Sequence, residues 1–288
     1  MANLKEIRAR IGSVNSTRQI TSAMKMVSAA KLKRASDAVI QLRPYANKLQ
    51  DILSNLSGNV ETKFAVNRDL KNVLIVAITS NRGLCGGFNN NVIKAANKII
   101  GDYQGKCNVA VLSIGKKASD FYRHTSYNIK GSDLPHHINE IFDHLTYDEV
   151  SKIVVNLMNH YLDGSIDKIV LVYNKFKNAA VQEVTTEQFL PIVPPATKGK
   201  NNTDYIFEPS KDEIVELLIP KTLKLQLFKA LLDSFASEHG ARMTAMHKAT
   251  DNATEMLKSL KLTYNKARQA AITNEILEIV GGAEALNG

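Results

Sequence analysis

A glycine-rich loop is the first feature of this sequence that could do chemistry. In NVLIVAITSNRGLCGGFNNN, Asn72–Asn91, an apolar run is followed by Gly83, Gly86 and Gly87 and then by a helix-like segment. Strand, glycine loop and helix follow one another in this order in many phosphate-binding proteins. A P-loop also needs a Lys and a Ser or Thr after its last glycine, and a Rossmann fingerprint needs G-x-G-x-x-G. The loop has neither, which favours a tight strand-to-helix turn with Arg82 exposed over a nucleotide site.

The remaining reactive side chains do not form a recognisable catalytic or metal-binding group. Cys85 follows Arg82 closely and is a candidate thiolate, but no His or carboxylate lies near it in the sequence, which favours a structural thiol. His136 and His137 lie in a loop-like stretch without further ligands at metal spacing, so we expect solvated histidines. His239 occupies a heptad core position, where a packed or register-setting residue is commoner than a ligand. We therefore expect no catalytic residue, no metal and no cofactor.

The glycine loop belongs to a central segment in which short apolar runs alternate with amphipathic stretches. The β-branched runs predict buried parallel strands at 72–79, 108–114 and 168–173, and an added strand at 181–190. The stretches between them predict helices at about 89–103, 116–124 and 147–162. This alternation predicts a doubly wound, Rossmann-like α/β domain over roughly residues 70–195.

The N-terminal segment has the periodicity of a long helix. Apolar residues are spaced three and four apart from Leu4 to Val14 and again from Leu32 to Leu56. Between these blocks the heptad register passes through polar residues, while the apolar ones slip by one place to Ile20, Met24 and Val27. We expect the apolar stripe to change face around residues 18–28. We also expect Pro44 to kink this helix, and Ser57-Gly58-Asn59 to end it.

The C-terminal segment predicts a still longer helix, from about Asp212 to Ala283, with Pro220 inside it and Gly281-Gly282 near its end. Such a helix is on the order of 100 Å long. Its expected seam runs through Met246, Ala249, Ala253, Met256, Leu260, Thr263, Ala267 and Ala270. The simplest way to cover both stripes is an antiparallel coiled coil of the two terminal helices, and a homodimeric coil is the alternative.

Two features of these helices predict a surrounding partner. The far seam of the C-terminal helix is built from small residues, which supply little burial energy. The end of the chain, QAAITNEILEIVGGAEALNG, is apolar around most of the helix, and such a helix is buried in protein or in membrane. It contains Asn274, Glu275 and Glu278 and is too short to span a bilayer, so we expect a protein sleeve.

Positive charge is concentrated on the N-terminal helix. Residues 1–58 contain ten Lys or Arg against three acidic residues, a net charge of +7, whereas residues 211–288 contain ten of each sign. A basic helix suits an anionic surface, such as phosphates, anionic lipid or an acidic protein collar. A DNA-binding basic region would be denser than this one, which is interrupted by SAMKMVSAA. An enzyme that uses the glycine loop and a coiled-coil nucleic-acid binder are the two rival classes.

Several motifs together resemble one family. ITNEILEIVGGAEA, Ile272–Ala285, matches the signature I-T-x-E-x-x-E-x-x-x-G-A of the gamma subunit of F-type, proton-translocating ATP synthase. Three further segments are similar to that family: Lys5–Ala35, SNRGLCGGFN at Ser80–Asn89, and Ser237–Thr273. The resemblance covers essentially the whole chain in order and begins at its first residues, so we expect a bacterial chain without a transit peptide.

The resemblance implies a central rotor shaft without catalytic chemistry of its own. The terminal helices would form an antiparallel coil inside three alpha and three beta subunits, with the α/β base domain on the membrane ring of c subunits and epsilon alongside. Rotation of the c ring would drive ATP synthesis at the beta subunits. The expected location is the cytoplasmic face of the bacterial inner membrane, with membrane contact only through the c ring and no nucleic-acid partner. The expected parts are a helix at 1–58, a base domain with connector at 59–208 and a helix at 209–288.

The resemblance also implies individual contact residues. Arg268 and Gln269 match residues that hydrogen-bond a loop of one beta subunit, and Thr273 and Glu275 support that end. Met24 and Lys25 match the place where the shaft passes acidic loops of beta, and Arg82 is a further candidate contact with beta. Tyr205 and Glu208 match the foot on the c ring. Asn81 and Phe207 depart from the family pattern, which has Asp and commonly Tyr at these places, and no third cysteine is present for the thiol switch of the chloroplast type.

Overall fold

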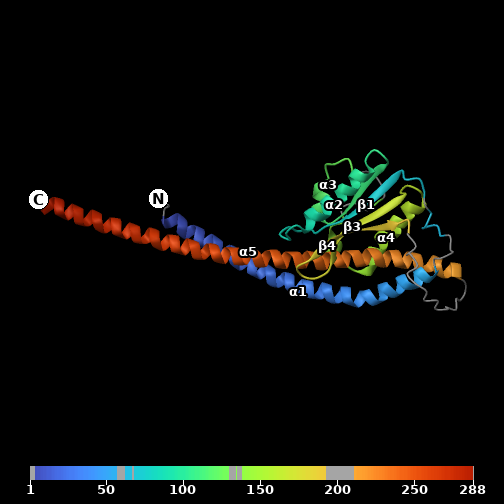
Figure 1. Ribbon diagram of the computed structural model, residues 1–288, viewed down its shortest axis with the longest axis horizontal. Coiled ribbons are helices and arrows are strands. Elements are labelled where there is room, and N and C mark those ends of the chain that lie inside the picture. Colours follow the sequence, from blue (N-terminus) through green and yellow to red (C-terminus); the bar gives the residue numbers. More distant parts are fainter. Residues whose placement is uncertain are drawn as a thin grey trace. The chain divides into compact units, whose positions relative to one another are not determined.

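The protein divides into two compact units, in a computed structural model that describes residues 4–56, 62–66, 68–129, 134, 138–192 and 211–287. The two-helix unit comprises Met1–Ser28 with Met243–Gly288, and the sheet unit comprises Ala29–Arg242. Two long helices, α1 (Leu4–Leu56) and α5 (Lys211–Asn287), contribute residues to both units (Figure 1).

A four-stranded sheet forms the centre of the sheet unit, in the order β2-β1-β3-β4. Its strands are β1 (Asn72–Ile78), β2 (Asn108–Ile114), β3 (Lys168–Phe176) and β4 (Gln182–Leu190). Strand β1 is parallel to β2 and β3, and β4 adds to β3 in the antiparallel direction. The predicted parallel strands and the added strand are therefore confirmed.

Both faces of the sheet are covered, which explains why β1 is a nearly continuous apolar run. Ile75 and Ala77 of β1 face α2 (Phe88–Tyr103) and α3 (Lys116–Tyr122), whereas the alternate residues face the opposite side. On that side the sheet packs against α4 (Tyr147–Leu162) and against the first part of α5. The buried residues that α5 contributes to this core are Val215, Ile219, Leu223, Leu227, Ala230 and Leu231.

In the two-helix unit, α1 and α5 of the same chain pack antiparallel, as predicted. The Arg8 guanidinium donates a hydrogen bond to the Tyr264 hydroxyl at 2.8 Å, and the Thr250 hydroxyl donates to the Thr21 hydroxyl at 2.9 Å. The residue numbers of the two pairs add up to almost the same value, which is the mark of an antiparallel register. The helices are therefore paired within one chain.

The seam of α5 differs from the predicted one at alternate positions from Met256 onward. Leu257 is 7 % exposed, whereas the predicted Met256 is 46 % exposed. Likewise Tyr264 is half-buried and Thr263 is exposed. The error came from choosing 3–4 spacing where the structure uses 4–3 spacing.

Around residues 18–28 the apolar residues of α1 leave the buried face, as predicted, while the seam itself keeps its heptad register. The buried residues there are the polar Thr21 and Ser28, while the apolar Ile20 and Val27 are exposed. The hydroxyl pair Thr21–Thr250 allows polar residues to stay in the seam at little cost, because the donor is satisfied. The apolar side chains are thereby left on the outer surface of α1.

Both long helices run through proline residues, and α5 also runs through a pair of glycines. Helix α1 runs through Pro44 as one element to Leu56, directly before the predicted stop at Ser57-Gly58-Asn59. Helix α5 runs through Pro220 and through Gly281-Gly282 to Asn287, beyond the predicted end at Ala283. Glycine lowers helix stability by only about 1 kcal/mol relative to alanine, which a long helix tolerates.

Candidate functional site

The glycine loop after β1 is a fixed turn, held by hydrogen bonds from polar side chains. The side-chain Oδ1 of Asn89 accepts a hydrogen bond from the backbone N–H of Ser80 at 2.9 Å, and the side-chain Nδ2 of Asn89 donates to the Cys85 sulfur at 3.2 Å. The Ser80 hydroxyl donates to the Arg82 carbonyl oxygen at 2.6 Å. Gly86 has φ of +60°, a conformation that favours glycine. Arg82 is exposed, as predicted.

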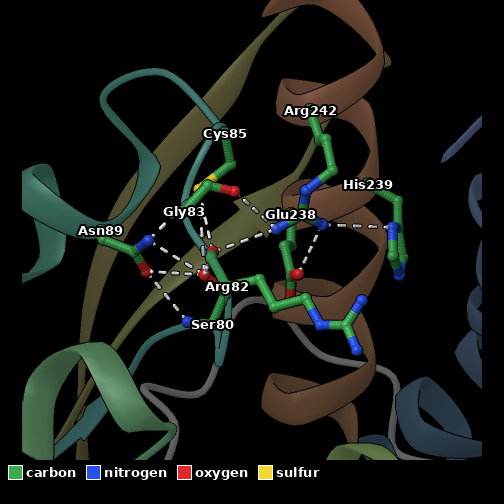
Figure 2. Close-up of polar contacts among 8 residues, drawn as sticks. All are labelled: Ser80, Arg82, Gly83, Cys85, Asn89, Glu238, His239 and Arg242. Carbon is green, nitrogen blue, oxygen red and sulfur yellow. Dashed lines mark hydrogen bonds and ion pairs between the residues drawn. The ribbon is translucent and has the colours of Figure 1, made fainter. Parts of the chain in front are cut away.

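Arg242 of α5 occupies the inner side of this loop (Figure 2). Its guanidinium donates to the carbonyl oxygens of Arg82 at 3.1 Å and Gly83 at 3.2 Å, and to the Glu238 carboxylate at 2.6 Å. The Arg242 and Glu238 side chains are only 8 % and 9 % exposed. A phosphate cradle presents backbone N–H groups to its ligand. This loop presents carbonyl oxygens to a cation of its own chain, so it is a docking contact with α5.

Burial sets the protonation of the groups around Arg242. Desolvation raises the pKa of the Cys85 thiol, opposed by the hydrogen bond from Ser80 and by the Arg242 charge, so Cys85 is a protonated, structural thiol. Desolvation also raises the pKa of Glu238, while the charge of Arg242 lowers it. A carboxylate and a guanidinium that are both buried and bonded to each other satisfy one another, and removing either leaves the other unpaired.

His239 is a packed residue, as expected from its heptad position. Its ring lies edge to face with Phe235 at a centroid distance of 4.6 Å, and its Nδ1 lies 3.5 Å from the Arg242 guanidinium. Burial lowers the pKa of His239 to about 4, and the Arg242 charge adds to this effect. The ring is therefore neutral near pH 7, and Nδ1 accepts from Arg242.

The C-terminal end of α5 extends beyond the end of its partner helix (Figure 1). From the Arg8–Tyr264 pair, the first described residue of α1, Leu4, lies opposite about residue 268 in an antiparallel coil. The remaining part of α5 is about 30 Å long. It carries five large apolar side chains that are 49 % to 71 % exposed, here called the apolar tip: Ile272, Ile276, Leu277, Ile279 and Val280.

Exposed apolar residues in such a continuous series mark a surface that binds another protein. Side chains that were expected to contact beta lie next to the tip or within it. Arg268, Gln269 and Glu275 are exposed, and the exposed Thr273 donates its hydroxyl to the Gln269 carbonyl oxygen at 2.9 Å. Their roles in binding a partner stay predictions.

The other predicted contact residues are spread over the chain. Met24 and Lys25 are half-buried on α1, where the neighbouring Met26 and Val27 are exposed. Met26 was missed, because its exposure depends on the seam register. The predicted c-ring contacts Tyr205 and Glu208 lie outside the described part of the chain. So do His136 and His137, which were expected to be solvated.

Sequence reasoning also missed the Glu238–Arg242 pair. A charged pair four residues apart is normally a surface feature, and only its place in the heptad core could have indicated burial. Among the residues that the structure describes, no helix has a stretch long and apolar enough to cross a membrane. The described residues also contain no group of three His, Cys, Asp or Glu side chains placed to hold a metal ion.

An antiparallel coil with an α/β unit and an exposed apolar end defines a coiled-coil protein built to bind other subunits. The family model described as ATP synthase matches residues 3–286. The chain is 62 % identical to the ATP synthase gamma chain of Flavobacterium johnsoniae and 60 % identical to that of Christiangramia forsetii, over the full length of both chains in each case. The chain therefore belongs to the ATP synthase gamma chain family.

Solved structures have the same fold at much lower sequence identity. A chain of the Euglena gracilis mitochondrial ATP synthase, OSCP/F1/c-ring, matches with a TM-score of 0.70 and 23 % identity, covering 98 % of this chain and 94 % of that one. A chain of the Tetrahymena thermophila mitochondrial ATP synthase central stalk and c-ring matches with a TM-score of 0.56 and 21 % identity, covering 80 % and 99 %. The arrangement of two long helices and a sheet is thus shared across distant sequences.

Proposed function

We propose that this gamma chain is the rotor shaft that couples rotation of a proton-driven c ring to ATP synthesis and hydrolysis at beta subunits, and that it is itself non-catalytic. The observation that carries the proposal is the apolar tip, an end of α5 that extends past the described part of α1 and exposes large apolar side chains. A ring of three alpha and three beta subunits would cover these side chains. The apolar contact lacks direction, so the shaft can turn without breaking a fixed set of hydrogen bonds.

Charge on α1 supplies the angle-dependent part of the mechanism. The basic N-terminal helix would attract acidic loops of the beta subunits, near Met24 and Lys25. Salt screens this attraction beyond about 8–10 Å, so each beta subunit would sense only the helix face turned toward it. The exposed apolar residues Met26 and Val27 lie on the same stretch of α1 and would add contact area there. One asymmetric shaft can in this way impose different states on identical subunits.

The other partners and the location are part of the same proposal. The foot around Tyr205 and Glu208 would contact the c ring, with the epsilon subunit alongside. Membrane association would then occur only through the c ring, at the cytoplasmic face of a bacterial inner membrane. The bacterial relatives at 60 % identity and above support this location.

The direct test is the double substitution Arg268→Ala with Gln269→Ala, made in the whole complex. Both side chains are exposed next to the apolar tip, so the chain itself should fold normally while ATP turnover or assembly falls. A matched control is Lys94→Ala with Lys98→Ala, two exposed residues on α2. The measurements are ATPase rate per complex and the yield of chain co-purified with alpha and beta at one copy per three of each. Normal turnover and yield in the first variant would contradict the proposal.

The glycine loop receives a separate test. Arg82 is exposed while its carbonyl oxygen is held by Arg242, so the fixed loop presents this side chain at the surface, where it could contact a beta subunit. Arg82→Ala should weaken coupling between ATP hydrolysis and proton pumping, or lower the assembly yield. Lys116→Ala, an exposed residue at the start of α3, is the control. Fully normal coupling in Arg82→Ala would remove this loop from the interface.

A further inference from the structure

A basic pocket in the sheet unit is not used by the proposed rotor function. It has a volume of about 400 Å³ and is lined by α1, by the end of β3 and by α5. The lining residues are Arg43, Lys175, Phe176, Lys177, Lys229 and Asp233. Hollows of this size are in the range that holds small ligands.

The positive charge of this pocket is only partly neutralised. Lys177 pairs with Glu183 at 2.8 Å, on the exposed rim. The remaining three cations are Arg43, Lys175 and Lys229, and Asp233 is the one carboxylate among the lining residues. Lys175 also acts on the Glu183 carboxylate at the rim, which Lys177 already pairs. The pocket therefore has a surplus of positive charge that comes from three separate elements of the fold.

Asp233 is the unusual member of the pocket. Its side chain is 1 % exposed, and neither carboxylate oxygen has a hydrogen-bond partner among the residues that the structure describes. A buried carboxylate without hydrogen bonds is costly, and it favours uptake of a proton. Burial raises the pKa of Asp233 to about 6, against the lowering effects of Lys229, Arg43 and Lys175, and Glu187 on β4 raises it further.

The walls of the pocket are held in place by contacts between the elements. The Arg43 guanidinium donates a hydrogen bond to the Phe176 carbonyl oxygen at 3.3 Å, which joins α1 to the end of β3. The Ser237 hydroxyl donates to the Asn174 carbonyl oxygen at 3.0 Å, which joins α5 to the same strand. The cations are thus presented by elements that are tied to one another.

We propose that this pocket binds a phosphate-class oxyanion, and that Asp233 couples the binding to proton uptake. Lysine and arginine donate charge-assisted hydrogen bonds to tetrahedral oxyanions, and arginine presents two parallel donors. The surplus charge converges on one hollow rather than forming a row along a helix, so a compact anion suits it better than an acidic peptide. With Asp233 ionised, the bound anion meets a like charge. With Asp233 protonated, that repulsion is gone.

The test uses the full chain and sulfate, whose own charge does not change between pH 5 and pH 8. We expect sulfate to bind about tenfold more tightly at pH 5 than at pH 8, the order of effect that one nearby charge has in a partly screened site. Lys175→Gln with Lys229→Gln should abolish binding at both pH values. Lys94→Gln with Lys98→Gln on α2 removes the same charge elsewhere and should leave the affinity unchanged, which separates a pocket from a general effect of net charge.

Asp233→Asn is the decisive variant, because it keeps the shape of the side chain and removes its titration. It should bind sulfate with an affinity that is the same at pH 5 and pH 8. Calorimetric titration at constant ionic strength gives the affinities, and circular dichroism confirms folding. Absence of sulfate binding in the wild-type chain, equal binding in the double lysine variant, or an unchanged pH dependence in Asp233→Asn would each overturn the proposal.

Two further arms identify the source of the anion. Inorganic phosphate and tripolyphosphate test the oxyanion alone, and ATP with adenosine as control tests a nucleotide. Tighter binding of ATP than of tripolyphosphate assigns the pocket to a nucleotide phosphate. Equal binding of the two assigns it to the free anion. Both outcomes support the proposal. Binding of a polyglutamate peptide without any binding of sulfate or phosphate would overturn it in favour of an acidic protein partner.

Discussion

Replacing His239 by Gln should change how the stability of the chain depends on pH. His239 is buried beside Arg242, and its pKa is lowered to about 4 from an ordinary value of 6.5. For a base whose pKa falls on folding, the stabilising contribution is present above the unfolded-state value and is lost as the pH falls through the folded-state value. The loss therefore occurs between about pH 6.5 and pH 4. Each pKa unit corresponds to about 1.4 kcal/mol, so the total is about 3 kcal/mol.

Asp233 acts in the opposite direction over almost the same range. Its pKa is raised to about 6 from 3.8, so its protonation stabilises the folded state at low pH. That contribution is lost as the pH rises through about 6, and it amounts to about 2 kcal/mol between pH 4 and pH 7.5. The two effects cancel in large part in the wild-type chain. In each single variant, we therefore expect the pH dependence of the unfolding free energy to show the contribution of the other residue alone.

The assay is urea unfolding at pH 4, 5, 6 and 7.5. The chain has no Trp and nine Tyr, so tyrosine fluorescence and far-UV circular dichroism are the signals. Other carboxylates titrate in this range, so the measured quantity is the difference in unfolding free energy between each variant and the wild type. For His239→Gln this difference should rise by about 3 kcal/mol as the pH falls from 7.5 to 4. For Asp233→Asn it should fall by about 2 kcal/mol. Differences that stay constant with pH would refute the reasoning.

Three further predictions concern the loop contact, one backbone position and the apolar tip. Arg242→Met should destabilise the chain by about 3–5 kcal/mol in urea unfolding, because Glu238 is left as an unpaired buried charge, and adding Glu238→Gln should recover part of the loss. Gly115→Ala should reduce the yield of folded protein severely, since its φ is +102° and a Cβ would meet the Thr79 carbonyl oxygen, and normal thermal stability would contradict this. Replacing all residues of the apolar tip by Gln should leave the melting temperature of the isolated chain within a few degrees of wild type while abolishing co-purification with alpha and beta, and a large drop in melting temperature would show that the tip packs within the chain.

The sheet could be predicted from the sequence because burial on both faces leaves a strong local signal. Strands buried between two layers of helices are continuous β-branched runs, as at Asn72–Ile78, and amphipathic stretches separate them. The antiparallel coil was predictable for a similar reason, since two apolar stripes on one chain need cover. The neighbours of β4 and the order of the strands depend on contacts far apart in the sequence, so periodicity alone does not determine them.

The sequence predicts that the two helices form a coiled coil, but it predicts less well which residues form the seam between them. Met256 and Leu257 are both apolar, and either one satisfies a 3–4 or a 4–3 spacing. The choice depends on the partner helix, where Thr21 accepts from Thr250 and Arg8 reaches Tyr264. The same dependence hid the exposure of Met26 on α1, whereas Ile20 and Val27 already depart from the heptad register in the sequence. A heptad pattern therefore predicts reliably that two helices pair. It predicts less reliably which of their residues remain exposed.

The glycine loop lies at the carboxyl end of β1, at the edge of a parallel sheet where α/β domains usually bind their ligands. Here Arg242 of α5 occupies that place, and two backbone carbonyl oxygens and Glu238 are its ligands. Arg242 is also the last residue of the sheet unit, and α5 continues from it as one helix to the apolar tip. In the proposed shaft, torque on the sheet unit would pass from this contact into the rest of α5. The edge of the sheet at which many α/β domains bind a nucleotide would thus hold α5, the helix that transmits the rotation.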